Sequence, residues 1–270
     1  TYGAICRSLE LALPCYGGAL HSILDVGAGT GAGSWAAQTL LGELQYTCLE
    51  REPAMIELGQ ALMAEQAELA RAKWLRQDIN SGLGGQQADL VLAAYTLGEL
   101  TEEDRARATE VLWNAARGML LLVEPGTPAG FAGLRRAREQ LLAQGVCRAA
   151  PIAVPAPCPH GNACPMAAED WCHFTVRVTR SRLHRLCKGG EAPFEDEKFA
   201  FLAVCRSEAK PAAARILRHP QKAGGHIGLT LCDAQGIERC IVSKKQRDAF
   251  RQARKAEAGA AFDGTEPQGR

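Results

Sequence analysis

The chain has 270 residues, of which 47% are hydrophobic, and its formal net charge is +1. This length suits one large domain with a smaller addition, and the composition excludes an intrinsically disordered protein. No run of about 18 apolar residues occurs, so a helical membrane span is excluded as well.

The cysteine content and the N-terminal residues indicate a reducing compartment. The chain holds 11 cysteines, an odd number, and its first residues lack the basic and apolar segments of a secretory signal peptide. We therefore expect neither an extracellular disulfide framework nor a disulfide-linked partner. The chain starts with Thr1 rather than methionine, which indicates a fragment or a processed chain.

The first motif is a glycine-rich turn between a predicted strand and a predicted helix. The segment Ser22–Gly31 reads S-I-L-D-V-G-A-G-T-G, and residues with helical spacing follow it. Gly27, Gly29 and Gly31 let backbone amides approach a ligand closely. Asp25 stands two residues before the first glycine, which disfavours a pyrophosphate and favours a ligand with an ammonium group, such as S-adenosylmethionine.

Alternating strands and helices continue up to about residue 144. We predict strands over Gln45–Glu50, Lys73–Ile79, Ala88–Tyr95 and Gly118–Gly126, and helices over Arg51–Leu69, Glu102–Arg117 and Phe131–Gln144. This alternation predicts an α/β fold with a doubly wound parallel sheet, in which ligands bind at the carboxyl ends of the strands.

Three polar residues fall at those strand ends. Glu50 is placed to accept hydrogen bonds from ribose hydroxyls, Asp78 to read an adenine amino group, and Tyr95 to line the same edge. An empty cleft in a decorated α/β fold is the alternative. The predicted S-adenosylmethionine site comprises Asp25, Gly27, Gly29, Gly31, Glu50, Asp78 and Tyr95.

The next motif is a cysteine-rich loop over Pro157–Phe174, which reads P-C-P-H-G-N-A-C-P-M-A-A-E-D-W-C-H-F. Its prolines and glycine favour an extended, turning loop in which Cys158, Cys164 and Cys172 can converge. Thiolates bind zinc and iron–sulfur centres, and the separations of five and seven residues differ from a C-x-x-C zinc site. An iron–sulfur cluster is therefore favoured over zinc, and buried unreactive cysteines are the alternative.

The loop itself does not identify the fourth ligand of the metal centre. The candidate cysteines are Cys187, Cys205, Cys232 and Cys240. His160 and His173 are alternative ligands, although each also suits a role as a hydrogen-bond partner within the loop.

Charge is distributed unevenly along the chain. Residues 1–170 carry 12 Lys and Arg against 19 Asp and Glu, whereas residues 171–255 carry 18 against 8. The basic part indicates a nucleic-acid partner, with solvated charged faces as the alternative. Its candidate RNA surface comprises Arg177–Lys188 and Lys244–Lys255, with Trp171 and Phe174 as stacking partners. Trp171 also suits a role as a cover over the metal centre.

The second half of the chain predicts a small β-rich addition. Short strands are expected over Lys198–Arg206, Ala214–Leu217, His226–Cys232 and Glu238–Ser243, followed by a basic helix over Lys244–Lys255. We therefore expect a cofactor-binding domain over residues 1–150, the cysteine loop and basic β-rich region over residues 151–255, and a disordered tail over residues 256–270.

Several motifs occurring in one order resemble a known family. They are A-P-C-P-H-G-N-A-C-P-M-x-x-x-D-W-C-H-F, F-E-D-E-K-F-A-F-L, A-R-I-L-R-H-P and G-L-T-L-C-D-A-Q-G, together with L-G-E-L and V-E-P-G-T-P. The chain is similar in these motifs to the methyltransferase-like small-ribosomal-subunit proteins of mitochondria and many bacteria.

This resemblance implies a class I methyltransferase fold, a bound [4Fe–4S] cluster and a role in assembling or maturing the small ribosomal subunit. Our hypothesis is that the chain acts on the ribosomal RNA of this subunit or on its assembly intermediates. The family's cluster cysteines fall on Cys158, Cys164, Cys172 and Cys232. The implied location is the cytoplasm in a bacterium or the mitochondrial matrix in a eukaryote, without a membrane partner.

The sequence does not identify a methyl acceptor or a catalytic residue. After the fourth strand it has A-A-Y-T-L-G-E-L, where amino-group methylases have an Asn-Pro-Pro-aromatic loop, and it lacks the Pro-Cys pair of pyrimidine methylases. Tyr95 and Glu99 are the polar residues in reach. The alternatives are a zinc-containing small-molecule methyltransferase and a catalytically inactive assembly factor that binds RNA or the ribosome.

Overall fold

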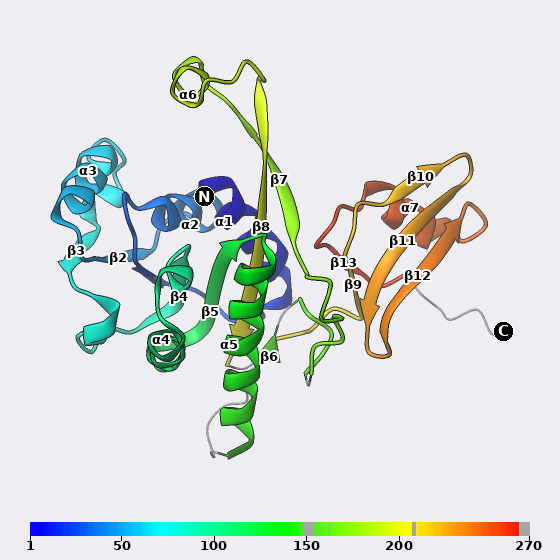
Figure 1. Ribbon diagram of the computed structural model, residues 1–270, viewed down its shortest axis with the longest axis horizontal. Helices are drawn as coiled ribbons and strands as arrows, with labels where there is room; N and C mark the ends of the chain where they lie inside the picture. The colour runs from blue at the N-terminus through cyan, green and yellow to red at the C-terminus, as the bar shows by residue number, and fades with distance from the viewer. Residues whose placement is uncertain (148–153, 156, 162, 207–208, 265–270) are drawn as a thin grey trace.

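The computed structural model describes residues 1–147, 154–155, 157–161, 163–206 and 209–264. These residues form a large sheet and a smaller C-terminal sheet (Figure 1). The strands are β1 (Ser22–Val26), β2 (Gln45–Glu50), β3 (Lys73–Arg76), β4 (Ala88–Ala94), β5 (Ala116–Pro125), β6 (Val154–Pro155), β7 (Phe174–Thr179), β8 (Phe194–Cys205), β9 (Ala214–Ile216), β10 (Gln221–Ala223), β11 (His226–Asp233), β12 (Gly236–Ser243) and β13 (Ala261–Phe262). The α-helices are α1 (Tyr2–Ala12), α2 (Ala32–Leu41), α3 (Pro53–Met63), α4 (Glu102–Ala115), α5 (Pro128–Cys147), α6 (Arg182–Lys188) and α7 (Arg247–Lys255). Short 3-10 helices are η1 (Leu13–Cys15), η2 (Leu69–Arg71), η3 (Ile79–Ser81) and η4 (Leu97–Glu99).

The large sheet contains the doubly wound parallel arrangement that the sequence predicts. Its strand order is β3-β2-β1-β4-β5-β8-β6, and β7 pairs with β8. Strands β1 to β5 are parallel, whereas β8 runs antiparallel to β5, β6 and β7. The order reverses between β1 and β4, and the crevice at such a switch point is where ligands bind in this fold class.

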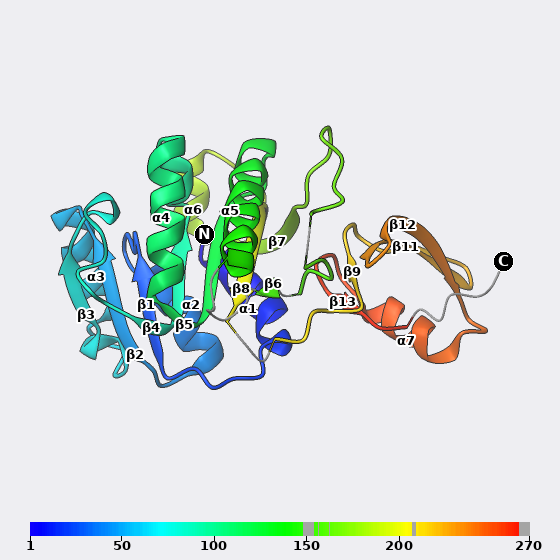
Figure 2. The ribbon, with the colours of Figure 1, turned by 90° about the horizontal axis from the view of Figure 1, so that it is seen from below.

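Two hydrophobic cores lie on opposite faces of the large sheet. Leu90 and Leu92 of β4 are buried in the core that α1 and α2 cover, and Val91 and Ala93 in the core that α4 and α5 cover. Figure 2 shows these helix pairs on either side of the sheet. Successive side chains of a strand point to opposite faces, so β4 contributes to both cores, and its residues 90–94 form a continuous apolar run.

Helix α1 precedes the first element that the sequence predicts. Its residues Ile5 and Leu9 are buried in the core, and the helix contacts α2, β7 and β8. It therefore helps to join the antiparallel edge of the sheet to the parallel part. None of the helices in the described ranges is long and apolar enough to cross a membrane.

Several element ends differ from the sequence prediction, among them those of β3 and α3. The predicted strand up to Ile79 stops at Arg76, because the side chain of Asp78 accepts a hydrogen bond from the Asn80 amide at 2.8 Å and caps η3. The helix predicted up to Leu69 ends at Met63. Both differences concern the ends of elements, where the regular structure is least sharply defined.

Strand β8 is longer than predicted and includes the acidic F-E-D-E segment. Its first half pairs with β7, and the two strands form a ribbon that extends beyond the sheet and ends in α6 (Figure 1). Asp196 accepts two hydrogen bonds from Arg177, its cross-strand partner, at 2.7 and 2.9 Å. Glu195 accepts hydrogen bonds from Arg180 at 2.7 and 3.0 Å. The acidic residues thus neutralise part of the predicted basic surface.

The small sheet follows the order β10-β11-β9-β13, with β12 on the other side of β11. It has a core of its own, which includes Ile216, Leu229, Leu231 and Phe262, and α7 packs against β11 and β12. Because β13 pairs with β9 and Phe262 is fully buried, the predicted disordered tail is wrong for this part. Residues 265–270 of that tail lie outside the described residues.

The large sheet also extends past the predicted domain boundary at residue 150. Strands β6, β7 and β8 come after this residue and belong to the same sheet as β1 to β5. The boundary itself falls within residues 148–153, outside the described residues. The proposed division into a cofactor domain and a β-rich addition therefore applies to the two sheets rather than to residue 150.

Candidate functional site

A cavity of about 350 Å³ opens at the carboxyl ends of β1, β2 and β4. Five of the seven predicted cofactor residues line it. They are Gly27, Gly29, Glu50, Asp78 and Tyr95. The cavity also includes Glu99, so the polar residues expected at this edge lie around one space.

The glycine loop brings the backbone up to the cavity. Gly27 has a φ of +67°, and a Cβ there would lie 2.5 Å from Oγ1 of Thr96. Gly29 has a φ of +55°, and a Cβ there would have no atom within 4 Å among the described residues. Both positions require the left-handed backbone that glycine adopts most readily. A side chain at Gly29 would project into open space at the cavity wall.

Glu50 ties the glycine loop to the end of β2. Its Oε2 accepts a hydrogen bond from the Gly29 amide at 2.7 Å. Its Oε1 accepts from the amides of Arg51 and Glu52 at 2.8 and 3.0 Å. A carboxylate has roughly four acceptor sites, so Glu50 retains one, on Oε2, for a further donor. The sequence predicts that Glu50 accepts hydrogen bonds from both ribose hydroxyls, but its carboxylate has room for only one more donor.

Asp78 and Tyr95 also line the cavity, where they follow β3 and β4. Asp78 caps η3 through Oδ1, and its other oxygen lies 4.0 Å from a guanidinium nitrogen of Arg51. Tyr95 has a φ of 59°, which is uncommon for a residue other than glycine. Its hydroxyl donates to Oε1 of Glu197 on β8 at 2.7 Å, and burial, together with this carboxylate, raises the pKa of Tyr95.

The other two predicted residues lie behind the cavity wall. Asp25 is 2% exposed, and its Oδ2 accepts from the amide and the hydroxyl of Ser34 in α2, at 2.7 and 2.9 Å. Burial raises the pKa of Asp25 to about 7. A Cβ at Gly31 would lie 2.1 Å from Cε of Met63, so this glycine permits close packing against α3. Both residues shape the loop rather than line the cavity.

The cavity contains residues that sequence reasoning missed. They are Val26, Arg51, Glu52, Met55, Gln77, Ile79, Thr96 and Leu100. Most of them are adjacent in sequence to a predicted residue, and this adjacency is the signal that could have identified them. Their side chains could be assigned to the cavity only once the strand ends were placed.

The cysteine pocket is the second site, and it lies between α5, β8 and β9. We define it as the cavity lined by Cys158, Cys164 and Cys172, together with Cys232, which belongs to the hydrophobic cluster against which the last two pack. Burial raises the pKa of Cys172 to about 11 and that of Cys232 to about 12, and the neighbouring thiols add to both increases. Cys232, which is distant in sequence from the loop, is thus a neighbour of its three cysteines in the fold.

The three remaining candidate cysteines lie elsewhere. Cys187 is exposed on α6, and Cys205 is buried in the large sheet opposite Met119. Cys240 lies on β12 and packs against the core of the small sheet. Of the four candidate cysteines, Cys232 is therefore the one that the fold brings next to the loop cysteines. The ten cysteines that the structure describes are all free of disulfides.

Two arginines of α5 hold the cysteine loop by its backbone. Arg135 donates to the carbonyl oxygens of Met166 and Cys164 at 3.1 and 3.4 Å. Arg138 donates to the carbonyl oxygen of His160 at 2.5 Å. The ring of His160 does not line the cysteine pocket.

Within the ranges that the structure covers, no group of three or more His, Cys, Asp or Glu side chains has the arrangement of a metal-ion site.

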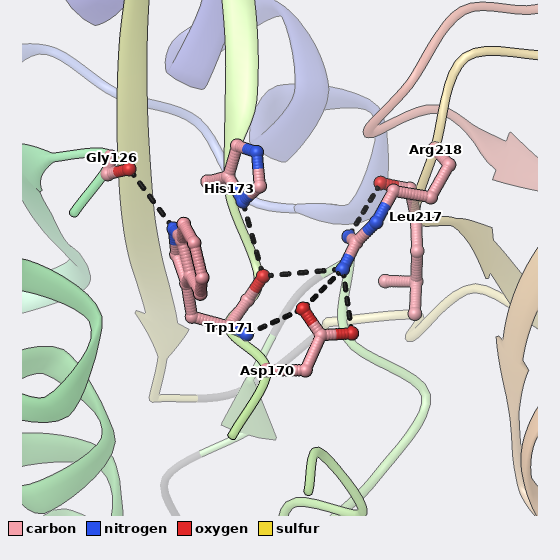
Figure 3. A network of polar contacts seen from close by, with 6 residues as sticks. All are labelled: Gly126, Asp170, Trp171, His173, Leu217 and Arg218. Atoms are coloured by element: carbon pink, nitrogen blue, oxygen red, sulfur yellow. Dashed lines mark hydrogen bonds and ion pairs between the residues drawn. The ribbon is translucent and has the colours of Figure 1, made fainter. Parts of the chain in front are cut away.

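A polar network beside the pocket joins three parts of the chain (Figure 3). Trp171 Nε1 donates to the carbonyl oxygen of Gly126, at the end of β5, at 3.0 Å. Arg218, which follows β9, donates to both carboxylate oxygens of Asp170 at 2.6 and 2.8 Å. His173 stacks on Trp171 and contacts its carbonyl oxygen at 3.1 Å, as its loop-partner alternative predicts. The cysteine loop is thus fastened to both sheets.

The candidate RNA surface is narrower than the sequence suggests. Phe174 is 2% exposed and packs against Phe199 and Phe201 with tilted rings, so the prediction that it stacks on bases is wrong. Arg177 and Arg180 are engaged by the acidic residues of β8. The exposed basic residues of the second stretch are Lys244, Lys245, Arg247, Arg251, Arg254 and Lys255. Helix α7 and the turn before it therefore form the principal basic surface.

The strand order, with a cavity at the strand ends, defines a class I methyltransferase-like protein with an appended antiparallel sheet. The chain belongs to the family described as "Mitochondrial small ribosomal subunit Rsm22", whose model matches residues 1–263. This match confirms the family that the sequence motifs indicate.

Two curated relatives are similar to this chain. The human (Homo sapiens) "Ribosome assembly protein METTL17, mitochondrial" is 28% identical over 249 residues, which cover 87% of this chain and 53% of that protein. The "Rsm22-cox11 tandem protein 2, mitochondrial" of Schizosaccharomyces pombe is 26% identical over 215 residues, which cover 64% of this chain and 29% of that protein. The chain therefore spans about half the length of the human relative and less of the yeast one.

Solved structures of methyltransferases share parts of the fold. A precorrin-6y C5,15-methyltransferase from Geobacter metallireducens matches with a TM-score of 0.48 and 15% identity, over 76% of this chain and 86% of that one. The magnesium protoporphyrin IX methyltransferase of Synechocystis PCC 6803, with bound SAM, matches with a TM-score of 0.45 and 16% identity, over 76% of each chain. These likenesses concern the fold alone.

Proposed function

We propose that this chain is a SAM-binding, [4Fe–4S]-containing methyltransferase-like protein that acts in assembly of the small ribosomal subunit, on its ribosomal RNA. The observation that carries the ribosomal role is the family match over residues 1–263. The human relative, described as a mitochondrial ribosome assembly protein, supports the same role. A mitochondrial matrix or bacterial cytoplasmic location follows from the proposal.

The cavity suits S-adenosylmethionine in volume and in polar groups. Gly29 leaves space at the cavity wall, and Glu50 retains an acceptor site for one ribose hydroxyl. Asp78, which lines the same cavity, would accept from the adenine amino group, and Tyr95 would line the space beside the cofactor. Asp25 and Gly31 support the loop from behind. When bound, the cofactor would supply an electrophilic methyl group to a nucleophile held in line with it.

We infer a cluster rather than a single zinc ion, because no group of three or more His, Cys, Asp or Glu side chains in the described ranges has the arrangement of a metal-ion site. Zinc holds four thiolates at about 2.3 Å from one atom, which requires close sulfur contacts. A [4Fe–4S] cluster separates its four thiolates more widely, because iron and sulfide lie between them. Cys158, Cys164, Cys172 and Cys232 would provide the donor set, because the first three line one pocket and Cys232 lies in the adjoining hydrophobic cluster.

A test of the metal is anaerobic purification followed by iron and sulfide analysis. We expect a brown protein with four irons and four sulfides per chain, as a [4Fe–4S] centre requires. The Cys232→Ser variant should lose the cluster, whereas Cys240→Ser should retain it, because Cys240 lies outside the cysteine pocket. A colourless protein that contains zinc would instead support the small-molecule methyltransferase alternative.

A second candidate function is an assembly factor that binds the cofactor without transferring its methyl group. The observation that favours it is the hydroxyl of Tyr95, which donates to Glu197 and is therefore engaged within the protein. A methyl-transfer assay with radiolabelled cofactor and small-subunit RNA separates the two functions. Incorporation of label into RNA supports the enzyme, and RNA binding without incorporation supports the inactive factor.

The RNA role is tested on helix α7. The double variant Arg247→Glu, Arg254→Glu should weaken binding of the holo-protein to small-subunit RNA at least tenfold in a filter assay. It should also reduce the slope of log affinity against log salt by about two, because each lost phosphate contact removes about one.

The matched control exchanges the ion pair of the ribbon. In Arg177→Asp, Asp196→Arg the charges change places and the pair is retained, so affinity should stay near that of the unmodified protein. A holo-protein without salt-sensitive affinity for small-subunit RNA would contradict the proposed role.

A further inference from the structure

Arg215 is buried at the wall of the cysteine pocket. It lies on β9, directly opposite Cys232 of β11, so the two side chains belong to the same face of the small sheet. The residue is 6% exposed and lines the cavity together with Cys158, Cys164 and Cys172. The small sheet thus places the guanidinium of Arg215 and the thiol of Cys232 side by side at the pocket.

The contacts of Arg215 fix its position without neutralising its charge. Its guanidinium carbon lies 4.3 Å from the ring centroid of Phe174 and 4.6 Å from that of Phe201. Its Nε donates to the carbonyl oxygen of Gly259 at 3.4 Å. Its Nη2 is buried and has no hydrogen-bond partner among the residues that the structure describes.

No carboxylate compensates this charge within the described part of the chain. The cavity lining contains Arg135, Arg138 and Arg215 but neither aspartate nor glutamate, and Arg215 forms no ion pair with a described residue. By contrast, the carboxylate of Asp170 engages Arg218 just outside the pocket. A buried cation with an unused donor is costly unless an anionic group occupies the space before it.

We propose that Arg215 is a positioning and charge-compensating residue for the anionic centre held by the four cysteines, and that its Nη2–H group donates to that centre. This inference rests on the proposed cluster. A [4Fe–4S] centre with four thiolates is negatively charged and becomes more negative when it gains an electron. A fixed cation and donor at its surface should therefore stabilise the reduced form and raise the reduction potential.

The principal test replaces the cation with an apolar side chain of similar length. Arg215→Met should lower the midpoint potential of the anaerobic holo-protein by about 59 mV, which is a tenfold change for a one-electron couple. Chelator-driven iron release should become about tenfold faster. The potential is measured by a redox titration followed by electron paramagnetic resonance. Arg215→Lys, which keeps the charge, should recover most of the potential.

The stability of the metal-free protein gives a second readout, in which the substitution should not be harmful. Without the cluster, Arg215→Met removes an uncompensated buried charge, so it should leave the urea midpoint unchanged or raise it. A purely structural arginine would behave differently, because its loss would lower the midpoint in both forms.

Arg206 provides the matched control. It also stacks on an aromatic ring, Trp113 at 4.4 Å, but it donates to the carbonyl oxygens of Ala116 and Trp113 and lies outside the cysteine pocket. Arg206→Met should destabilise the metal-free protein and leave the potential unchanged. These outcomes are the reverse of those expected for Arg215→Met.

Three results would overturn the inference. One is an Arg215→Met holo-protein with the potential and iron retention of the unmodified chain. Another is a metal-free Arg215→Met protein that is markedly less stable than the unmodified chain. The third is an unmodified chain that binds no iron and sulfide, and this result alone would also remove the cluster from the proposed function.

Discussion

Single residues at the cavity wall decide what the cavity can hold. Gly29 has a left-handed backbone and open space beyond its Cα, while its amide is held by Glu50 at 2.7 Å. The loop is therefore fixed in position, and its one missing side chain leaves room for a ligand. A bulky residue at this position should block the cavity while the loop keeps its anchor.

This geometry predicts the effect of Gly29→Arg on cofactor binding. The arginine side chain should fill the cavity and weaken S-adenosylmethionine binding at least 100-fold, or about 2.7 kcal/mol, in isothermal titration calorimetry. Gly189→Arg is the control, because Gly189 has a similar φ of +61° and open space around it, but caps α6 away from the cavity. Unchanged binding to Gly29→Arg would place the cofactor elsewhere.

At the scale of elements, the joint between β1 and α2 holds the glycine loop in shape. Asp25 comes from the strand and Ser34 from the first turn of the helix, and two hydrogen bonds connect them. A carboxylate near a helix N-terminus also interacts favourably with the helix dipole. Burial nevertheless raises the pKa of Asp25 to about 7, so its ionised form is costly in the folded protein.

This joint predicts a pH dependence of stability. Asp25 has a higher pKa in the folded chain than in the unfolded chain, so its contribution is greatest at low pH and is lost as pH rises through about 7. Between pH 5.5 and 8 the free energy of unfolding of the metal-free protein should fall by about 2 kcal/mol from this group. Urea unfolding at both pH values measures it.

The Asp25→Asn variant should lose this part of the pH dependence, since an amide does not titrate. Asp89→Asn is the control, because hydrogen bonds from His21 and Ser22 accompany a lowered pKa at Asp89, whose titration then lies below this pH range. An identical slope in Asp25→Asn and the unmodified protein would show that other groups cause the dependence.

At the scale of the whole molecule, the cysteine pocket lies where the two sheets meet. Cys158, Cys164 and Cys172 belong to the loop that follows α5, whereas Cys232 belongs to the small sheet. The small sheet also has a core of its own. A cluster bound by all four cysteines would therefore join two separately packed units, in addition to the tie through Arg218 and Asp170 (Figure 3).

This arrangement predicts a local response to removal of the cluster. Anaerobic chelation should raise hydrogen exchange of the β9 and β11 amides at least tenfold, while exchange in β1 to β4 stays unchanged, because the large sheet has its own cores. Mass spectrometry of peptides from both sheets measures this difference. A uniform increase over the whole chain would contradict it and indicate that both sheets unfold together.

The sequence by itself determined the elements whose signals are local. The apolar runs of β1, β2 and β4 and the glycines at alternate positions predict the parallel sheet and its cavity edge, because strand period and turn chemistry act over a few residues. The same reasoning brought Glu50, Asp78 and Tyr95 to one cavity. The family motifs added Cys232, which spacing alone left among several candidates.

The tertiary structure decided which side chains share a space. It placed Asp25 behind the cavity wall and buried Phe174 in the core. It also paired Asp196 of the acidic segment of β8 with Arg177. It also set Arg215 opposite Cys232 at the wall of the cysteine pocket. These contacts join residues that are distant in sequence, and they depend on strand register and packing, which local patterns do not contain.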